Sequence, residues 1–151
     1  MASQIDVAAE LAGVPLFVDL SPAQLDKVGQ AFEEHWFQPG ERAQRQGFAG
    51  GGFHVILDGQ AEWRVDGAVA DRTATRLATP KPFLLKRGDW FGELTILFDE
   101  PSISDVVATT PLQCVVLPPQ ELEPFLFSYP HVMYRLLLGE ARRLRDPLRW
   151  R

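Results

Sequence analysis

The 151-residue sequence has one cysteine, three histidines and no long apolar run, and each scarcity excludes a class of protein. Cys114 cannot form an internal disulfide, and its place in the apolar run 112–117 predicts a buried side chain, not a reactive thiol. No run approaches the roughly 20 apolar residues that a membrane-spanning helix needs. The N-terminus also lacks a basic segment followed by an apolar one. We therefore predict a cytoplasmic protein without membrane insertion.

Lysine and arginine are absent from residues 88–134, although this stretch contains seven acidic side chains. Six arginines return in residues 135–151, which carry a net charge of +4 and leave −9 for the rest of the chain. An acidic body argues against broad binding of nucleic acid. We also expect no sequence-specific DNA binding, because no segment for a helix-turn-helix follows the predicted last helix.

The histidine pattern argues against a metal enzyme. His35, His54 and His131 are far apart in the sequence, and no His-x-His pair offers the ligands of a cupin-type metal site. His54 lies in an apolar segment and is predicted to be a structural histidine. Glycines 50–52 lack the Lys-Ser/Thr that would complete a nucleotide-binding loop. We expect no catalysis, and a cupin-like metal enzyme stays a distant alternative.

Length and composition indicate one α+β domain over residues 1–151, with 46% hydrophobic and 23% charged residues. Helices are predicted in residues 1–32, where Ser21-Pro22 and Gln24 form a capped helix start. Short strands separated by glycines occupy residues 33–117, as in a β-sandwich or barrel. Asp58-Gly59 predicts a hairpin turn that pairs residues 53–57 with 60–65. Residues 66–82 are expected to form a long loop.

Two helices are predicted in residues 118–151, and the second, over 131–145, has an apolar stripe. The stripe consists of Val132, Met133, Leu136, Leu137, Ala141 and Leu144. Such a stripe packs on a core or contacts another molecule. Residues 131–145 are therefore the predicted contact for a protein partner or for a second copy in a homodimer.

Residues 87–108 are the most informative stretch. They predict a turn at Gly88-Asp89, a short helix over about 92–98, a polar loop, and a strand from about Ser104. Glu93 falls in the first helical turn, where a carboxylate suits the positive end of the helix dipole. The exposed amides of a helix start that faces a pocket can bind an anion.

This stretch resembles the phosphate-binding cassette of cyclic nucleotide-binding domains, the sensor domains of catabolite activator proteins and protein kinase A regulatory subunits. The resemblance rests on Gly88-Asp89, Phe91-Gly92-Glu93-Leu94, Pro101, Val106 and Ala108, and on glycines at 40, 47, 59, 88 and 92 where the family's turns fall. It implies an eight-stranded antiparallel β-sandwich, or jelly-roll barrel, with flanking N-terminal and C-terminal helices.

The resemblance implies a ligand site made of Phe91, Gly92, Glu93, Leu94, Ser102, Ile103 and Ser104. The amides after Gly92 would approach the cyclic phosphate, and Glu93 would bind the ribose 2′-hydroxyl. The family has an arginine directly after the proline that corresponds to Pro101, whereas this chain has Ser102. Loss of one partner of a buried hydrogen-bonded charge pair costs roughly 2–5 kcal/mol. Asp105 would add repulsion if it faced the same pocket.

We therefore predict a non-enzymatic regulatory or interaction module with a degenerate phosphate cassette. One alternative is a functional sensor of cAMP or cGMP that uses a substitute cation from Lys86, Arg87, Arg72 or Arg76. Another is a sensor of a neutral or less anionic ligand in the same pocket. No cofactor is required by the sequence, and cAMP and cGMP are the candidates that the resemblance supplies.

Overall fold

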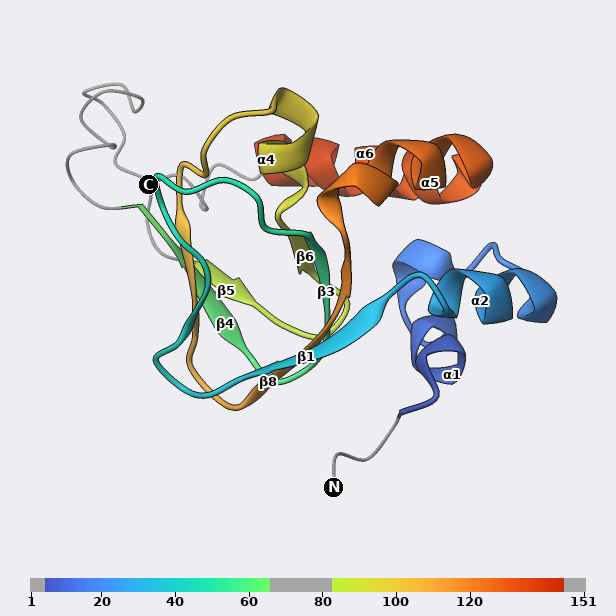
Figure 1. The fold of residues 1–151 in the computed structure, drawn as a ribbon, viewed down its shortest axis with the longest axis horizontal. Coiled ribbons are helices and arrows are strands. Elements are labelled where there is room, and N and C mark those ends of the chain that lie inside the picture. Colours follow the sequence, from blue (N-terminus) through green and yellow to red (C-terminus); the bar gives the residue numbers. More distant parts are fainter. Residues whose placement is uncertain (1–4, 66–82, 146–151) are drawn as a thin grey trace.

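Two four-stranded antiparallel sheets form the centre of the computed structural model, which describes residues 5–65 and 83–145 (Figure 1). One sheet has the order β1-β8-β3-β6 and the other the order β2-β7-β4-β5. The strands are β1 (Glu33–Phe37), β2 (Arg42–Gln44), β3 (Phe53–Asp58), β4 (Ala61–Arg64), β5 (Phe83–Leu85), β6 (Trp90–Phe91), β7 (Asp105–Ala108) and β8 (Leu112–Leu117). The predicted α+β class and eight-stranded sandwich are confirmed.

Helices precede, interrupt and follow the strands. They are α1 (Val7–Ala12), η1 (Pro15–Phe17), α2 (Pro22–Gly29), α4 (Glu93–Phe98), η2 (Pro119–Glu121), α5 (Leu122–Ser128) and α6 (Pro130–Arg145). Figure 1 shows α1 and α2 on one side of the sandwich, while the C-terminal part of α6 runs beside α4. The short α4 therefore lies between β6 and β7 in the chain and beside the last helix in space.

The start of α2 follows the predicted capping pattern. The Gln24 amide donates to the Ser21 hydroxyl oxygen at 3.2 Å, and the Ser21 amide donates to the Gln24 side-chain oxygen at 2.9 Å. Each side chain therefore satisfies a backbone donor that the first helical turn leaves unpaired. This fixes the residue at which α2 begins, at the side of the sandwich.

Two apolar clusters hold the fold together. The first joins the terminal helices to one sheet and includes Phe17, Phe32 and Phe125, whose rings pack edge-on or tilted at 5.9–6.4 Å. The second lies between the sheets and includes Cys114, which is fully buried as predicted. Burial raises the pKa of the Cys114 thiol to about 12, so this side chain behaves as a small apolar group.

The predicted hairpin of residues 53–57 with 60–65 is wrong. β3 pairs with β6 and β8, whereas β4 pairs with β5 and β7 in the other sheet. Gly59, with a φ of +89°, turns the chain from one sheet into the other, and a Cβ there would lie 2.0 Å from the Pro111 carbonyl oxygen. The sequence predicts the turn at Gly59, but it does not predict which sheet the strand before the turn and the strand after it join. The predicted long loop, 66–82, lies outside the described residues.

The predicted single stripe of α6 splits into two faces. Val132 and Leu136 are buried in the core, but Met133, Leu137 and Leu144 are exposed. The prediction treated neighbouring positions as one face, although α5 and the sheet cover only part of the helix circumference. None of the helices in the described part of the chain is both long and apolar enough to cross a bilayer.

Candidate functional site

A cavity of about 500 Å³ is enclosed by strands of both sheets, α4 with its following loop, and the end of α6. Its lining includes all seven predicted site residues, which are Phe91, Gly92, Glu93, Leu94, Ser102, Ile103 and Ser104. Four further lining residues that the sequence did not single out, Gln44, Trp63, Glu140 and Arg143, come from distant elements. The volume lies within the range of small-molecule sites.

Gly92 sets the geometry of this cavity. Its φ is +93°, and a Cβ would lie 2.3 Å from the carbonyl oxygen of Gly52, so only glycine fits without a backbone shift. The turn starts α4 at Glu93 and places that side chain inward, where it is 2% exposed. The close contact between Gly92 and Gly52 thus positions the carboxyl of the cassette.

The Glu93 end of the cavity carries charge from three side chains. Arg143, on α6, donates from Nη1 to Glu93 Oε2 at 3.1 Å and to Glu140 Oε1 at 3.2 Å. Its Nη2 donates to the Trp90 carbonyl oxygen at 2.7 Å. One guanidinium therefore ties α6 to both the cassette carboxyl and the strand that precedes it.

Burial raises the pKa of the Glu93 carboxyl well above its ordinary value. The hydrogen bond and negative charge of Glu140 act in the same direction, and Arg143 opposes them. The raised pKa is the direction expected physically, because Arg143 divides its hydrogen bonds among Glu93, Glu140 and a carbonyl. The Glu93 carboxyl consequently retains a proton more readily than an isolated carboxyl does.

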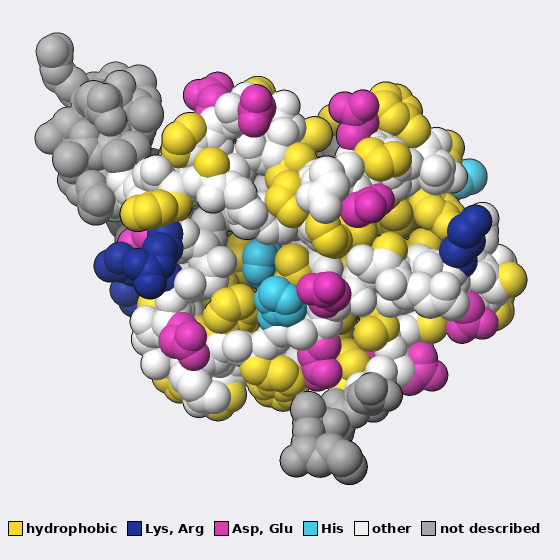
Figure 2. Space-filling view, viewed as in Figure 1, with side chains coloured by type: hydrophobic (Ala, Val, Ile, Leu, Met, Phe, Trp, Pro, Cys, Tyr) yellow, Lys and Arg dark blue, Asp and Glu magenta, His cyan; other side chains and the backbone are white. Residues whose placement is uncertain are grey.

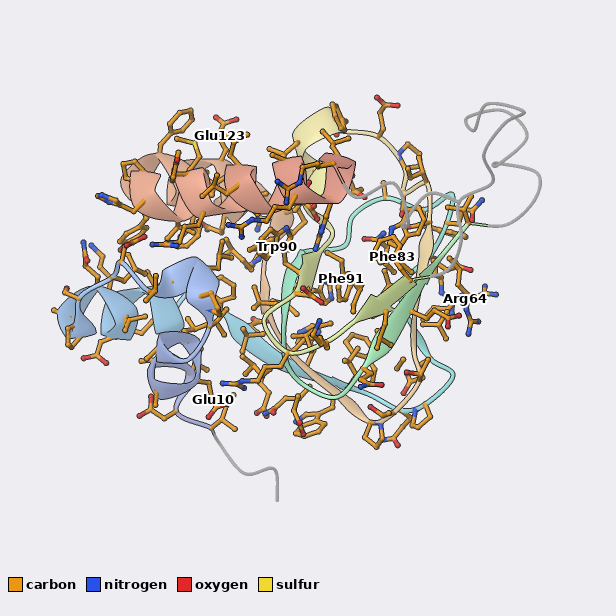
Figure 3. The ribbon with its side chains drawn as sticks, turned by 180° about the vertical axis from the view of Figure 1, so that it is seen from behind. Glu10, Arg64, Phe83, Trp90, Phe91 and Glu123 are labelled. Atoms are coloured by element: carbon orange, nitrogen blue, oxygen red, sulfur yellow. The ribbon has the colours of Figure 1, made fainter. Side chains whose placement is uncertain are left out.

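Trp90 is the surface on which the end of α6 rests. A Cβ at Gly139 would lie 2.2 Å from the Trp90 ring, so the backbone of the helix packs directly on the ring at this glycine. The indole Nε1 donates to Glu140 Oε1 at 3.0 Å, and the Arg143 guanidinium carbon lies 4.9 Å from the ring centroid. Figure 3 shows Trp90 beneath the helix with Phe91 next to it.

The neutral end of the cavity is the group Gln44, Ser102 and Ser104, where the resemblance predicts the phosphate and where no side chain carries formal charge. Gln44 Nε2 donates to the hydroxyl oxygens of Ser102 at 2.7 Å and Ser104 at 3.1 Å. The Ser102 hydroxyl donates to the Ser104 carbonyl oxygen at 2.7 Å, and the Ser102 amide donates to the Phe48 carbonyl oxygen at 2.9 Å. Both Ser102 donors therefore already have partners within the protein.

Aromatic side chains also form a wall of the cavity. Trp63 on β4 and Phe83 on β5 stack with ring centroids 4.8 Å apart and an interplanar angle of 20°. Figure 3 shows Phe83 on the strand layer, on the same side of the molecule as Phe91. Such a wall favours a flat, largely apolar ligand over a compact ion.

Several residues considered from the sequence lie elsewhere. Asp105 accepts a hydrogen bond from the Gln46 amide at 2.7 Å, pairs with Arg42 at 3.5 Å, and is not part of the cavity lining. Arg87 donates to the Leu57 carbonyl oxygen at 2.6 Å, and neither it nor Lys86 lines the cavity. Arg72 and Arg76 lie outside the described residues.

Two of the three histidines are closer than their sequence separation suggested. The rings of His35 and His54 lie 6.4 Å apart on β1 and β3, the two strands that flank β8 in one sheet. His54 is buried, stacks on Phe91 at 4.5 Å and hydrogen-bonds the Gly52 carbonyl oxygen at 2.8 Å, and desolvation lowers its pKa to about 4. Within 5–65 and 83–145, no three His, Cys, Asp or Glu side chains converge as a metal site would require.

Comparison with known proteins agrees with this geometry. Residues 34–129 match the family model described as cyclic nucleotide-binding domain. A cGMP-dependent protein kinase of Eimeria tenella is 28% identical over 131 residues, which cover 87% of this chain and 12% of the kinase. The chain thus spans about an eighth of that relative, and the activity of the whole kinase belongs to a much longer protein.

Solved structures share the fold at lower identity. The catabolite activator protein of Thermus thermophilus superposes with a TM-score of 0.69 at 23% identity, covering 88% of this chain and 59% of that one. The regulatory subunit of a cAMP-independent protein kinase A from Trypanosoma cruzi, bound to guanosine, gives 0.64 at 24% identity and covers 89% and 48%. These likenesses describe the shared architecture.

Proposed function

Because the chain belongs to the cyclic nucleotide-binding domain family, we propose that it is a non-enzymatic regulatory or interaction module whose cassette does not hold a cyclic phosphate tightly. The single observation that carries this proposal is the neutral end of the cavity. Ser102 stands there without formal charge, with its hydroxyl and amide bound internally. Of the described residues that line the cavity, Arg143 alone is basic, and two carboxyls engage it.

Calorimetric titration with cAMP and cGMP tests this proposal. We expect affinity weaker than roughly millimolar for the wild type. Ser102→Arg is expected to bind cAMP about 30-fold to several thousand-fold more tightly, because it supplies the missing partner of the phosphate. Wild-type binding at micromolar concentration that Glu93→Ala removes would contradict the proposal and make the domain a cyclic nucleotide sensor.

A sensor of an uncharged ligand is the second candidate. The cavity remains open and has the Trp63–Phe83 wall, although its phosphate end is neutral. A structural relative was solved with guanosine, which carries no phosphate, and this supports a nucleoside as the ligand class. Titration of the wild type with guanosine and adenosine tests it, and cAMP is the charged comparison. Preference for the nucleoside over cAMP is the expected result.

The interaction part of the proposal concerns α6. Its exposed side chains Met133, Leu137 and Leu144 form an apolar row that the described part of the chain leaves uncovered. We expect this row to contact a protein partner or a second copy. Sedimentation of wild type and Leu137→Asp tests the second copy: a dimer that dissociates in the variant supports it, and monomers in both exclude it and leave the protein partner as the prediction. The single domain 1–151 and the cytoplasmic location stay predictions.

A further inference from the structure

We propose that the cavity binds a flat organic cation, with an aromatic ring on the Trp63–Phe83 wall and a protonated amine directed at Glu93. This inference rests on the proposed function, in which the cassette does not hold a cyclic phosphate tightly, and it names a ligand class for the same cavity. It also extends the second candidate, because the excess of carboxyls that disfavours an anion favours a cation over an uncharged molecule.

The carboxyls that line the cavity outnumber its basic groups. Glu93, Glu100 and Glu140 belong to the lining, and Arg143 is the one basic side chain among the described lining residues. Arg143 Nη1 pairs with Glu93 at 3.1 Å and with Glu140 at 3.2 Å. When both of these carboxyls are ionised, the three side chains together carry one uncompensated negative charge. A ligand with one positive charge brings this group to neutrality.

One oxygen of the Glu93 carboxyl is left for such a ligand. Arg143 pairs with Oε2, and residues 5–65 and 83–145 supply no ion pair at Oε1. Glu93 is 2% exposed, so a cation beside it interacts through a medium of lower dielectric than water, where charge pairs are stronger. The raised pKa of Glu93 agrees with this charge balance, because burial and Glu140 outweigh Arg143. A second cation would favour the ionised carboxyl.

Aromatic and aliphatic side chains make up most of the remaining lining. Trp63 and Phe83 stack with ring centroids 4.8 Å apart, and Leu85 and Ile103 also line the cavity. A ligand ring gains stacking contacts on such a wall, and a positive charge near an aromatic face is attracted to the ring electrons. A bare metal ion fits poorly, because no three His, Cys, Asp or Glu side chains of the described residues converge. A ring with one charged arm suits this largely apolar cavity better.

Three small molecules that share an indole ring test the charge preference of the full chain. On the same two-carbon arm, tryptamine carries an ammonium, tryptophol a hydroxyl and indole-3-propionate a carboxylate. Calorimetric titration should show tryptamine binding at least about 10-fold more tightly than tryptophol, the lower end of what a hydrogen bond to a charged group contributes. Indole-3-propionate should bind most weakly. Equal binding of tryptamine and tryptophol, or no binding of tryptamine at roughly 10 mM, would overturn the inference.

The matched pair Glu93→Gln and Glu123→Gln tests which carboxyl is responsible. Glutamine keeps the size of the side chain and removes its charge, and Glu123 is an exposed residue of α5 outside the cavity lining. Glu93→Gln should weaken tryptamine binding about 10-fold and leave tryptophol binding unchanged. Glu123→Gln should change neither. Unchanged tryptamine binding by Glu93→Gln, or an equal loss in both variants, would contradict the role given to Glu93.

The indole N–H signals of the protein locate the bound cation. Trp63 and Trp90 line the cavity, whereas Trp36 is 54% exposed and lies outside the lining. In the ¹H–¹⁵N spectrum of labelled wild type, unlabelled tryptamine should shift the signals of Trp63 and Trp90 and leave that of Trp36 in place. A shift of Trp36 alone would mean binding at the outer surface and would overturn the inference.

Titration with cAMP separates this inference from the proposed function. Micromolar cAMP binding by the wild type would overturn the proposed function. Weak cAMP binding together with no preference for tryptamine over tryptophol would leave the proposed function standing and overturn the cation site alone.

Discussion

The neutral end of the cavity, Gln44 with Ser102 and Ser104, is held by hydrogen bonds without formal charge, whereas the charged end, Glu93 and Glu140 with Arg143, contains ion pairs. The neutral end is built entirely from the sandwich and the loop after α4. The charged end joins the sandwich to α6. A change at the neutral end should therefore stay local, while a change at the charged end should reach the last helix.

The surface around the cavity shows the same contrast. Figure 2 shows acidic side chains beside apolar ones over α4 and α5 on one face, while the basic side chains visible there lie elsewhere. Leu94, Leu97 and Phe98 of α4 are among the exposed apolar residues. Among the described residues that line the cavity, the one basic side chain, Arg143, comes from α6.

The largest effect is expected from a substitution in the Gly92 turn, on which both ends of the cavity depend. Gly92→Ala should lower the free energy of unfolding by about 3 kcal/mol, because alanine is strained at a φ of +93° and its Cβ would meet the Gly52 carbonyl. Urea unfolding measures the change. Gly51→Ala is the control, since a Cβ there meets nothing within 4 Å. Equal effects of the two variants would show that Gly92 is not required by packing.

The charged end should be more sensitive than the neutral end. Arg143→Met is expected to cost about 1.5–3 kcal/mol, the range for hydrogen bonds to charged groups. Arg142→Met, at an exposed neighbour, should change stability by less than about 0.5 kcal/mol. Thermal unfolding of both variants measures the difference. Matching losses would mean that the contacts of Arg143 contribute nothing beyond its surface charge.

The pH dependence of the free energy of unfolding should also differ between the charged end and the neutral end of the cavity. A carboxyl whose pKa is raised by folding stabilises the protein below its unfolded pKa, and this contribution is lost as pH rises through the folded pKa. For Glu93 the wild type should therefore lose stability as pH increases from about 5. Glu93→Gln should remove that loss, so its stability relative to wild type should improve with pH. Unfolding at several pH values measures this.

Glu100→Gln is the control for that experiment, because Glu100 lines the same cavity but is exposed. It should leave the pH dependence of the wild type unchanged. A Glu93→Gln variant that becomes relatively less stable as pH rises would show that Glu93 is held as a fully ionised partner of Arg143. The charged end would then be an ordinary ion pair.

The smallest effect is expected at the neutral end. Ser102→Ala should cost about 1 kcal/mol, because it removes neutral hydrogen bonds to Gln44 and the Ser104 carbonyl. A double-mutant cycle with Gln44→Ala should show coupling between these two positions and none with Arg143→Met. Coupling between Ser102 and Arg143 would contradict the prediction that the neutral and charged ends of the cavity act independently.

Much of the fold followed from local patterns. The glycine at 92, the Ser21 capping box and the apolar strand segments encode geometry that a few neighbouring residues specify. The seven predicted cassette residues also converge on one cavity, because 91–94 and 102–104 belong to one continuous stretch around α4. Their roles in ligand binding stay predictions.

The missed residues share a different property. Gln44, Trp63 and Arg143 reach the cavity from three elements far from the cassette in sequence. Arg143 is one of three basic residues in the last turns of α6. Helical periodicity offered a signal for it, because Arg143 follows Leu136 by seven residues and Val132 by eleven and so lies on the face that these two residues bury.

The sequence by itself determined the family and the strand-and-helix order, and it predicts that Ser102 stands where the family has an arginine. These are properties of contiguous residues whose backbone preferences and side-chain types can be recognised locally. Only the tertiary structure decided that β3 and β4 join different sheets, that α6 has one buried and one exposed apolar face, and that Arg143 reaches Glu93. Each depends on how separate elements pack, and packing direction is set by the whole core and not by any one segment.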